Sequence, residues 1–140
     1  MSSRNFPQNI RMDSILKEKY LDTVVRDPQS VYYKRELGEA YLMAASIGLS
    51  TGTFIESKVS REVRVYVTLS EQSKLLIDVI AASGSKYDFD ALLDGARVLK
   101  IVEGYANGGA QLMHQKATNS IASEIDKDIW EIANSLHPAA

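Results

Sequence analysis

The chain contains no cysteine, which excludes disulfide bonds, thiolate metal ligands and cysteine nucleophiles. Proline is scarce as well, and Pro7, Pro28 and Pro138 all lie outside the long periodic segments in the middle of the chain. No apolar run reaches the roughly 18 residues that span a bilayer, and residues 1–10 lack the apolar stretch of a signal peptide. These absences predict a cytoplasmic protein that does not enter a membrane.

Side-chain patterns typical of catalysis are also missing. Histidine occurs only as His114 and His137, which do not have the spacing of a metal-ligand motif. No serine lies in a Gly-x-Ser-x-Gly elbow, and the loop from Gly48 to Thr53 lacks the lysine of a phosphate-binding P-loop. We therefore predict that the protein is not an enzyme, with no catalytic residues, no cofactor and no metal site.

The 140 residues have the size and composition of one globular domain, with 45% apolar and 24% charged side chains. We expect residues 1–10 to be a flexible N-terminal segment and residues 11–140 to form a single helical domain. The net charge of −2 offers no general attraction for nucleic acid. Contact with DNA would therefore need a local basic patch.

Apolar residues recur at helical spacing along most of the chain. In the third predicted helix, Leu75, Leu76, Val79 and Ile80 are expected to face inward. Gly48 is expected to end the second helix, and the Asn107-Gly108-Gly109 segment to end or kink the fifth. The predicted helices cover residues 12–25, 31–47, 71–84, 90–93, 95–114 and 119–136.

One segment has the period of a strand instead. Three valines alternate with three other side chains from Val63 to Thr68, so the valines would face inward and Arg64, Tyr66 and Thr68 outward. A single strand needs a partner for its backbone groups, either Phe54–Val59 in a hairpin or a strand of a second chain. The predicted fold is mainly α, with five to six helices and one short β-strand or hairpin around residues 54–68.

A local basic patch lies on this strand and just before it. Lys58, Arg61 and Arg64 fall within seven residues, and Tyr66 follows on the same strand face as Arg64. Cations can contact phosphates and an aromatic ring can stack on a base, so these four residues are the candidate nucleic-acid-binding site. The same charges would also suit a solvated edge strand that is protected from aggregation.

The order strand, helix, turn, helix over residues 61–105 resembles a ribbon-helix-helix DNA-binding module. In that family two strands from two chains pair and enter the major groove. The resemblance implies an intertwined homodimer in which Arg64, Tyr66 and Thr68 read the DNA. The chain departs from the family in having sixty residues before the strand and an acidic second half.

A second resemblance covers residues 33–114. It lies in the segment Ala40–Leu49, in Glu62–Val67, and in the Tyr-Ala-Asn-Gly-Gly sequence at residues 105–109. These segments resemble a family of small proteins associated with Dnd-type DNA phosphorothioation and restriction systems. The resemblance implies an accessory role in antiviral defence beside a protein partner of a DNA-modification complex, and it brings no catalytic residues.

Three functions remain open from the sequence. The first is a non-enzymatic accessory protein of a DNA-modification-linked defence system, which binds a partner protein or DNA. The second is a ribbon-helix-helix-like transcriptional regulator. The third is a structural or assembly homo-oligomer with no nucleic-acid role. Dimerisation, salt-sensitive DNA binding and co-purifying proteins would distinguish them.

Overall fold

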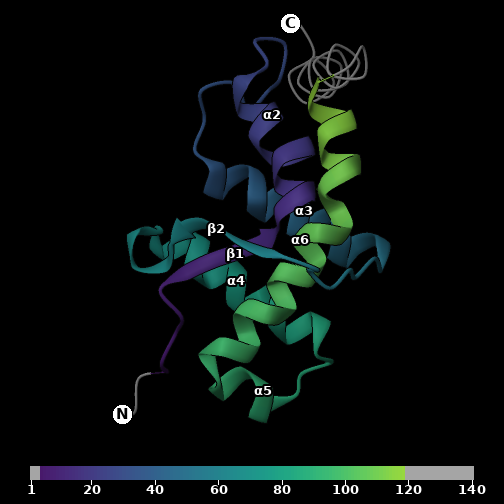
Figure 1. Ribbon diagram of the computed structural model, residues 1–140. Coiled ribbons are helices and arrows are strands. Elements are labelled where there is room, and N and C mark those ends of the chain that lie inside the picture. The colour runs from purple at the N-terminus through teal and green to yellow at the C-terminus, as the bar shows by residue number, and fades with distance from the viewer. Residues whose placement is uncertain (1–3, 119–140) are drawn as a thin grey trace, which may run out of the picture.

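The computed structural model describes residues 4–118, which form several helices and one two-stranded antiparallel sheet (Figure 1). This confirms the prediction of a mainly α fold with a short β element inside residues 54–68. The predicted helix 119–136 lies outside the described residues. The elements are β1 (Asn9–Asp13), α1 (Ser14–Leu16), the π-helical η1 (Lys17–Leu21), α2 (Asp22–Arg26), α3 (Leu37–Thr51), β2 (Ser60–Val65), the 3-10 turn η2 (Tyr66–Thr68), α4 (Glu71–Gly84), α5 (Phe89–Leu93) and α6 (Gly95–Thr118).

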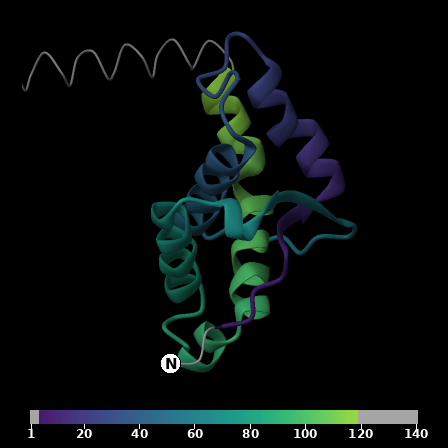
Figure 2. The same cartoon turned by 90° about the vertical axis from the view of Figure 1, so that its left-hand side faces the viewer.

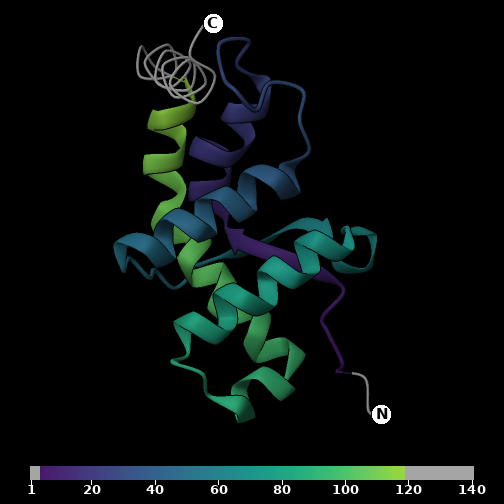
Figure 3. The same cartoon turned by 180° about the vertical axis from the view of Figure 1, so that it is seen from behind.

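Helix α6 is the element around which the others pack. It runs from the top of the molecule to near its lower end, with α3 and α4 on one side and β1 with the following helix on the other (Figure 2). Viewed from behind, α3 and α4 lie in front of it (Figure 3). Asp94 begins α6 by accepting the backbone N–H groups of Ala96 and Arg97, as helix-capping rules predict.

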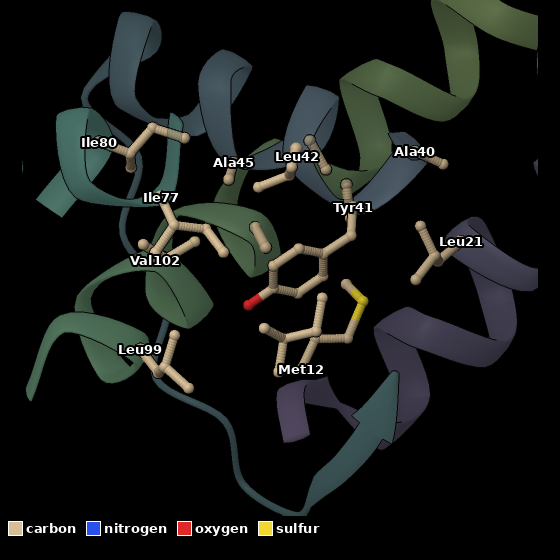
Figure 4. Close-up of a cluster of buried hydrophobic side chains, with 14 of the residues drawn as sticks. Met12, Leu21, Ala40, Tyr41, Leu42, Ala45, Ile77, Ile80, Leu99 and Val102 are labelled. Atoms are coloured by element: carbon tan, nitrogen blue, oxygen red, sulfur yellow. The ribbon is translucent and has the colours of Figure 1, made fainter. Parts of the chain in front are cut away.

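The core is filled by apolar side chains from α3, α4, α6 and β1. Tyr41 lies fully buried at the centre of the cluster, and its hydroxyl donates a hydrogen bond of 2.8 Å to the Arg11 carbonyl (Figure 4). Burial, and secondarily the negative charge of Glu103, raise the pKa of Tyr41 well above its usual value. The hydroxyl therefore serves as a neutral donor that ties α3 to β1.

Two glycines allow α3 and α6 to cross at close range. A Cβ atom at Gly48 would overlap the Tyr105 carbonyl, and one at Gly109 would overlap the Ala44 carbonyl. The predictions that Gly48 and residues 107–109 end helices are wrong, because α3 and α6 continue through these positions. The left-handed C-cap of α3 is Gly52, with φ 68°.

Strand β2 overlaps the predicted strand at Val63–Val65, but it begins at Ser60, and residues 66–68 form the turn η2 instead. Its partner also differs from the predicted one. It pairs antiparallel with β1, with Met12 opposite Arg61 and an irregularity between Ile10 and Arg11. Residues 54–59 do not form a strand, so the hairpin prediction is wrong on this point. Residues 9–13 form β1, in which Ile10 and Met12 are fully buried, so the first helix begins at Ser14 instead of Met12.

The segment before β1 is held against the body of the protein. Arg4 forms a salt bridge of 2.8 Å with Asp78 of α4, and the ring of Phe6 stacks on Tyr66 with centroids 4.2 Å apart. Ile10 belongs to β1. Residues 4–10, which the sequence suggested as a flexible lead-in, therefore have specific contacts in the fold.

The second helix also begins later than its apolar pattern suggested. Ser30 accepts a hydrogen bond from the backbone of Tyr32 inside a turn, and Lys34 has a positive φ of 60°. A non-glycine residue in that conformation cannot continue an α-helix. Helix α3 therefore starts at Leu37.

Of the four side chains of α4 that were predicted to face inward, Ile80 is buried, but Leu75, Leu76 and Val79 are not. Ile77, Ile80 and Ala81 are buried, whereas Leu75 is 64% exposed and Val79 50% exposed. Leu76 also counts among the exposed apolar side chains. Apolar residues occur on both sides of this helix, so periodicity alone could not select the inward side. We call Leu75, Leu76 and Val79 the α4 outer face.

This orientation gives a first prediction about stability. Replacing the buried Ile77 by alanine should lower the free energy of unfolding by roughly 3 kcal/mol, since transfer and cavity terms add. Replacing the exposed Leu75 by alanine should change it by less than about 0.5 kcal/mol. Urea unfolding of both variants measures the difference, and a larger loss for Leu75 than for Ile77 would show that α4 is rotated.

Candidate functional site

The four residues of the predicted nucleic-acid patch do not share one surface. Lys58 and Arg61 are exposed, and Arg64 lies 3.5 Å from Glu36. Tyr66 is only 8% exposed, because its ring packs on Phe6. Burial, and next the charge of Asp78, raise the pKa of Tyr66. Tyr66 is therefore part of the core and is not placed to stack on a base.

Arg61 has other neighbours than the sequence suggested. It lines a polar hollow of about 300 Å³ together with residues of the helix that follows β1, among them Lys17 and Arg26. Lys17 is paired with Asp22 at 2.9 Å. The hollow also includes Ser14 and Glu18, so both signs of charge line it.

Asp13 joins the strand pair to the helix that follows it. One carboxylate oxygen accepts the backbone N–H groups of Ile15 and Leu16 as an N-cap, and the other accepts the N–H of Lys58 at 2.8 Å. Burial acts to raise the pKa of Asp13, but these backbone donors outweigh it and hold the pKa below its ordinary value. The ionised carboxylate thus organises both segments.

The pH dependence of stability follows from that lowered pKa. The stabilisation by Asp13 should be complete above its unfolded pKa of about 3.9 and should be lost as the pH falls through the lower pKa of the folded state. Asp13→Asn should therefore be less stable than wild type at neutral pH, with a gap that narrows in acid. Denaturant unfolding between neutral and strongly acidic pH checks this, and a constant gap would contradict it.

Asn107 links α6 to the strand pair and to the loop before β2. Its carbonyl oxygen accepts the backbone N–H of Asp13, and its amide nitrogen donates to the Ile55 carbonyl and the Ser57 hydroxyl, each at 2.8 Å. The residue is buried, and these bonds satisfy its side chain. Asn107 thus supplies the edge of β1 with a partner that a third strand would otherwise provide.

Glu103, one turn before Asn107 on α6, continues this network. Its Oε2 accepts hydrogen bonds from the hydroxyls of Ser57 and Ser60. Each serine is held by a further donor, Ser57 by Asn107 and Ser60 by the Arg11 guanidinium. The carboxylate is therefore fixed in one orientation before any ligand arrives.

Two hollows meet at this carboxylate. One measures about 250 Å³ and is bordered by Phe54, Glu56 and Ile101, and the other measures about 290 Å³ and is bordered by Arg11 and Leu99. Both are lined by Ser60, Lys100 and Glu103. We call the two together the Glu103 cleft. No motif in the sequence predicted this cleft. The one local signal is Asn107, a polar residue within a helical run of small and apolar residues.

Elsewhere, the exposed surface carries large apolar side chains in two neighbouring helices. The α4 outer face is one group, and Phe89 and Leu93 of α5 are both exposed by more than two-thirds. Single exposed apolar residues are ordinary, but several on one helix indicate a contact surface.

Comparison of the chain with protein-family models, with curated proteins and with solved structures finds no match. Across residues 4–118, no helix combines the length and the apolar character needed to cross a membrane. Within the same residues, no three histidine, cysteine, aspartate or glutamate side chains gather in a way that could hold a metal ion.

Proposed function

We propose that the protein is an accessory component of a DNA-modification-linked defence system, and that it acts by binding a protein partner through the α4 outer face. The observation that carries the proposal is the exposure of Leu75, Leu76 and Val79 on a helix whose opposite side is buried in the core. The defence setting rests on the resemblance of residues 33–114 to proteins of Dnd-type systems.

A helix that is apolar on both sides suits a position between its own domain and a second molecule. Residues 75, 76 and 79 are neighbours on the helix surface, so their side chains form one continuous strip. Burying such a strip removes apolar area from water at about 25 cal/mol per Å². Covering this face is therefore favourable, whereas leaving it in solvent brings no stability.

Direct DNA contact is the second candidate, with weaker support. Lys58 and Arg61 remain exposed, but Tyr66 is buried and Arg64 lies beside Glu36. The ribbon-helix-helix alternative needs a strand from a second chain, and one edge of β2 already pairs with β1 of its own chain. The partner-protein proposal has more support, because Leu75, Leu76 and Val79 are all exposed, whereas Tyr66 of the predicted DNA patch is buried.

The experiment is co-expression of the tagged full-length chain with the products of the genes that flank its own. We expect one product to be retained, and expect Leu75→Glu or Val79→Glu to lose it. Gln111→Glu is the matched control, because it places the same charge on an exposed position of α6, a helix that carries no part of this face. Thermal melts should show all three variants folded.

Two other results would redirect the proposal. Sedimentation that shows a dimer dispersed by Leu75→Glu would assign the face to a second copy of the chain. DNA binding with a steep salt dependence, lost in the Arg61→Ala and Arg64→Ala double variant, would assign the function to DNA. Equal retention of the product by wild type and both charged variants would overturn the α4 outer face as the binding surface.

A further inference from the structure

We infer that the Glu103 cleft binds a guanidinium group, the side chain of an arginine in a protein segment. This is a second site, separate from the α4 outer face, and its test does not depend on the outcome there. The inference rests on a carboxylate that the fold orients, on a second carboxylate beside it, and on an exposed aromatic ring in the same wall.

The two carboxylate oxygens of Glu103 differ in their contacts. Oε2 already accepts two serine hydroxyls, while in the described part of the chain Oε1 has no hydrogen-bond partner. Every buried side-chain oxygen and nitrogen there has a partner, so Oε1 must reach solvent. The carboxylate is therefore anchored through one atom and open to a donor through the other.

An aromatic ring and a second carboxylate line the wall of the Glu103 cleft. The ring of Phe54 packs against Gly104, where a Cβ atom would overlap it, and it meets the ring of Tyr105 edge-on at 5.2 Å. Phe54 is nevertheless 47% exposed, so part of its ring borders the open hollow. Glu56 borders the same hollow and is also exposed.

The chemistry of this wall matches a guanidinium group. Two carboxylates favour a cation, and an aromatic surface favours a flat cation that can lie over it. A guanidinium group is planar, always charged and able to pair with a carboxylate while it stacks, whereas an ammonium group cannot stack. An arginine side chain therefore fits this wall better than a lysine side chain.

Positive charges near the cleft have different roles. Arg11 already has partners within the chain, because its guanidinium donates to the Ser60 hydroxyl and carbonyl and lies 3.6 Å from Glu62. Lys100 is exposed, lines both hollows and lies one turn from Glu103 on α6. Its ammonium group competes with an incoming cation. Removing the charge of Lys100 should therefore raise the affinity of the cleft for a guanidinium group.

The test is an NMR titration of the full-length protein with N-acetyl-arginine amide. N-acetyl-citrulline amide is the control, because it has nearly the same shape without the charge. We expect the arginine compound to shift resonances of residues 54–60 and 100–104 and to bind at least about tenfold more tightly than citrulline, as a charge-assisted hydrogen bond implies. Lys100→Gln should strengthen arginine binding.

Two variants separate recognition from folding. Glu103→Gln keeps an acceptor for the serine hydroxyls and should abolish the preference for arginine over citrulline. Phe54→Leu keeps an apolar side chain and should weaken arginine binding more than citrulline binding, because only the arginine group is a cation over the ring. Glu39→Gln, an exposed carboxylate on α3, should behave as wild type. Equal affinity for arginine and citrulline in the wild type, or weaker arginine binding by Lys100→Gln, would overturn the inference.

Discussion

Replacing Gly109 by alanine is expected to lower the free energy of unfolding by about 4 kcal/mol, although alanine favours helix formation over glycine by about 1 kcal/mol. The added Cβ would overlap the backbone carbonyl of Ala44 and approach the backbone nitrogen of Gly48 at 2.6 Å. Backbone atoms inside a helix cannot rotate away, so α3 and α6 would have to separate. That separation would open the packing around the central core cluster.

Gly104→Ala is the control for this prediction. It adds the same methyl group to the same helix, but the overlap there is with the ring of Phe54, which is partly exposed and can turn outward. Urea unfolding should therefore show a much smaller loss for Gly104→Ala than for Gly109→Ala. Equal losses, or a gain at Gly109, would mean that the two helices are farther apart than described.

Replacing Asn107 by leucine should cost a similar amount, about 4 kcal/mol. The change keeps the approximate volume but leaves the backbone N–H of Asp13 and the carbonyl of Ile55 without their partners. A buried polar group that loses its partner costs about 1–3 kcal/mol, and the loop contact through Ser57 is lost as well. The strand pair would then loosen from α6.

Gln111→Leu provides the comparison, because it makes the same kind of amide-to-leucine change one turn later at an exposed position. It should alter stability by less than about 0.5 kcal/mol. Hydrogen exchange adds a local readout, since the amides of residues 9–13 should lose protection in Asn107→Leu. A variant with unchanged melting and unchanged exchange would show that Asn107 is not the link between these segments.

Local sequence patterns predicted where helices and strands occur better than they predicted which elements pair with each other. The short helix at α5, the start of α6 after Asp94 and the part of β2 from Val63 to Val65 follow from side chains within a few residues. The pairing of β2 with β1 joins residues about fifty positions apart. The alternation in β1 is short and adjoins a helical pattern, so nothing local marks it as a strand.

Glycine and apolar positions were ambiguous for a different reason. Gly48 and Gly109 suit helix ends, but they also suit close helix contact, and only the neighbouring helix decides between these roles. In α4 the sequence offers two apolar sides, and packing against α3 and α6 selects the one with Ile77 and Ile80. The outward side then became the main candidate for binding.

The candidate sites show the same limit. Arg61 and Lys58 are exposed as a basic patch requires, but Phe6, far away in sequence, removes Tyr66 from the surface. The Glu103 cleft brings together side chains from β1, the loop before β2 and α6. None of these segments contains a motif by itself, so only the folded chain could reveal the site.

The α4 outer face is the proposed binding surface for the protein partner. Methyl NMR of the full-length protein, labelled at leucine and valine, tests it most directly when the retained partner is added. We expect the methyl signals of Leu75, Leu76 and Val79 to shift while those of the buried Val98 and Val102 stay in place. Shifts confined to Val63 and Val65 of β2, with the α4 signals unchanged, would contradict the account.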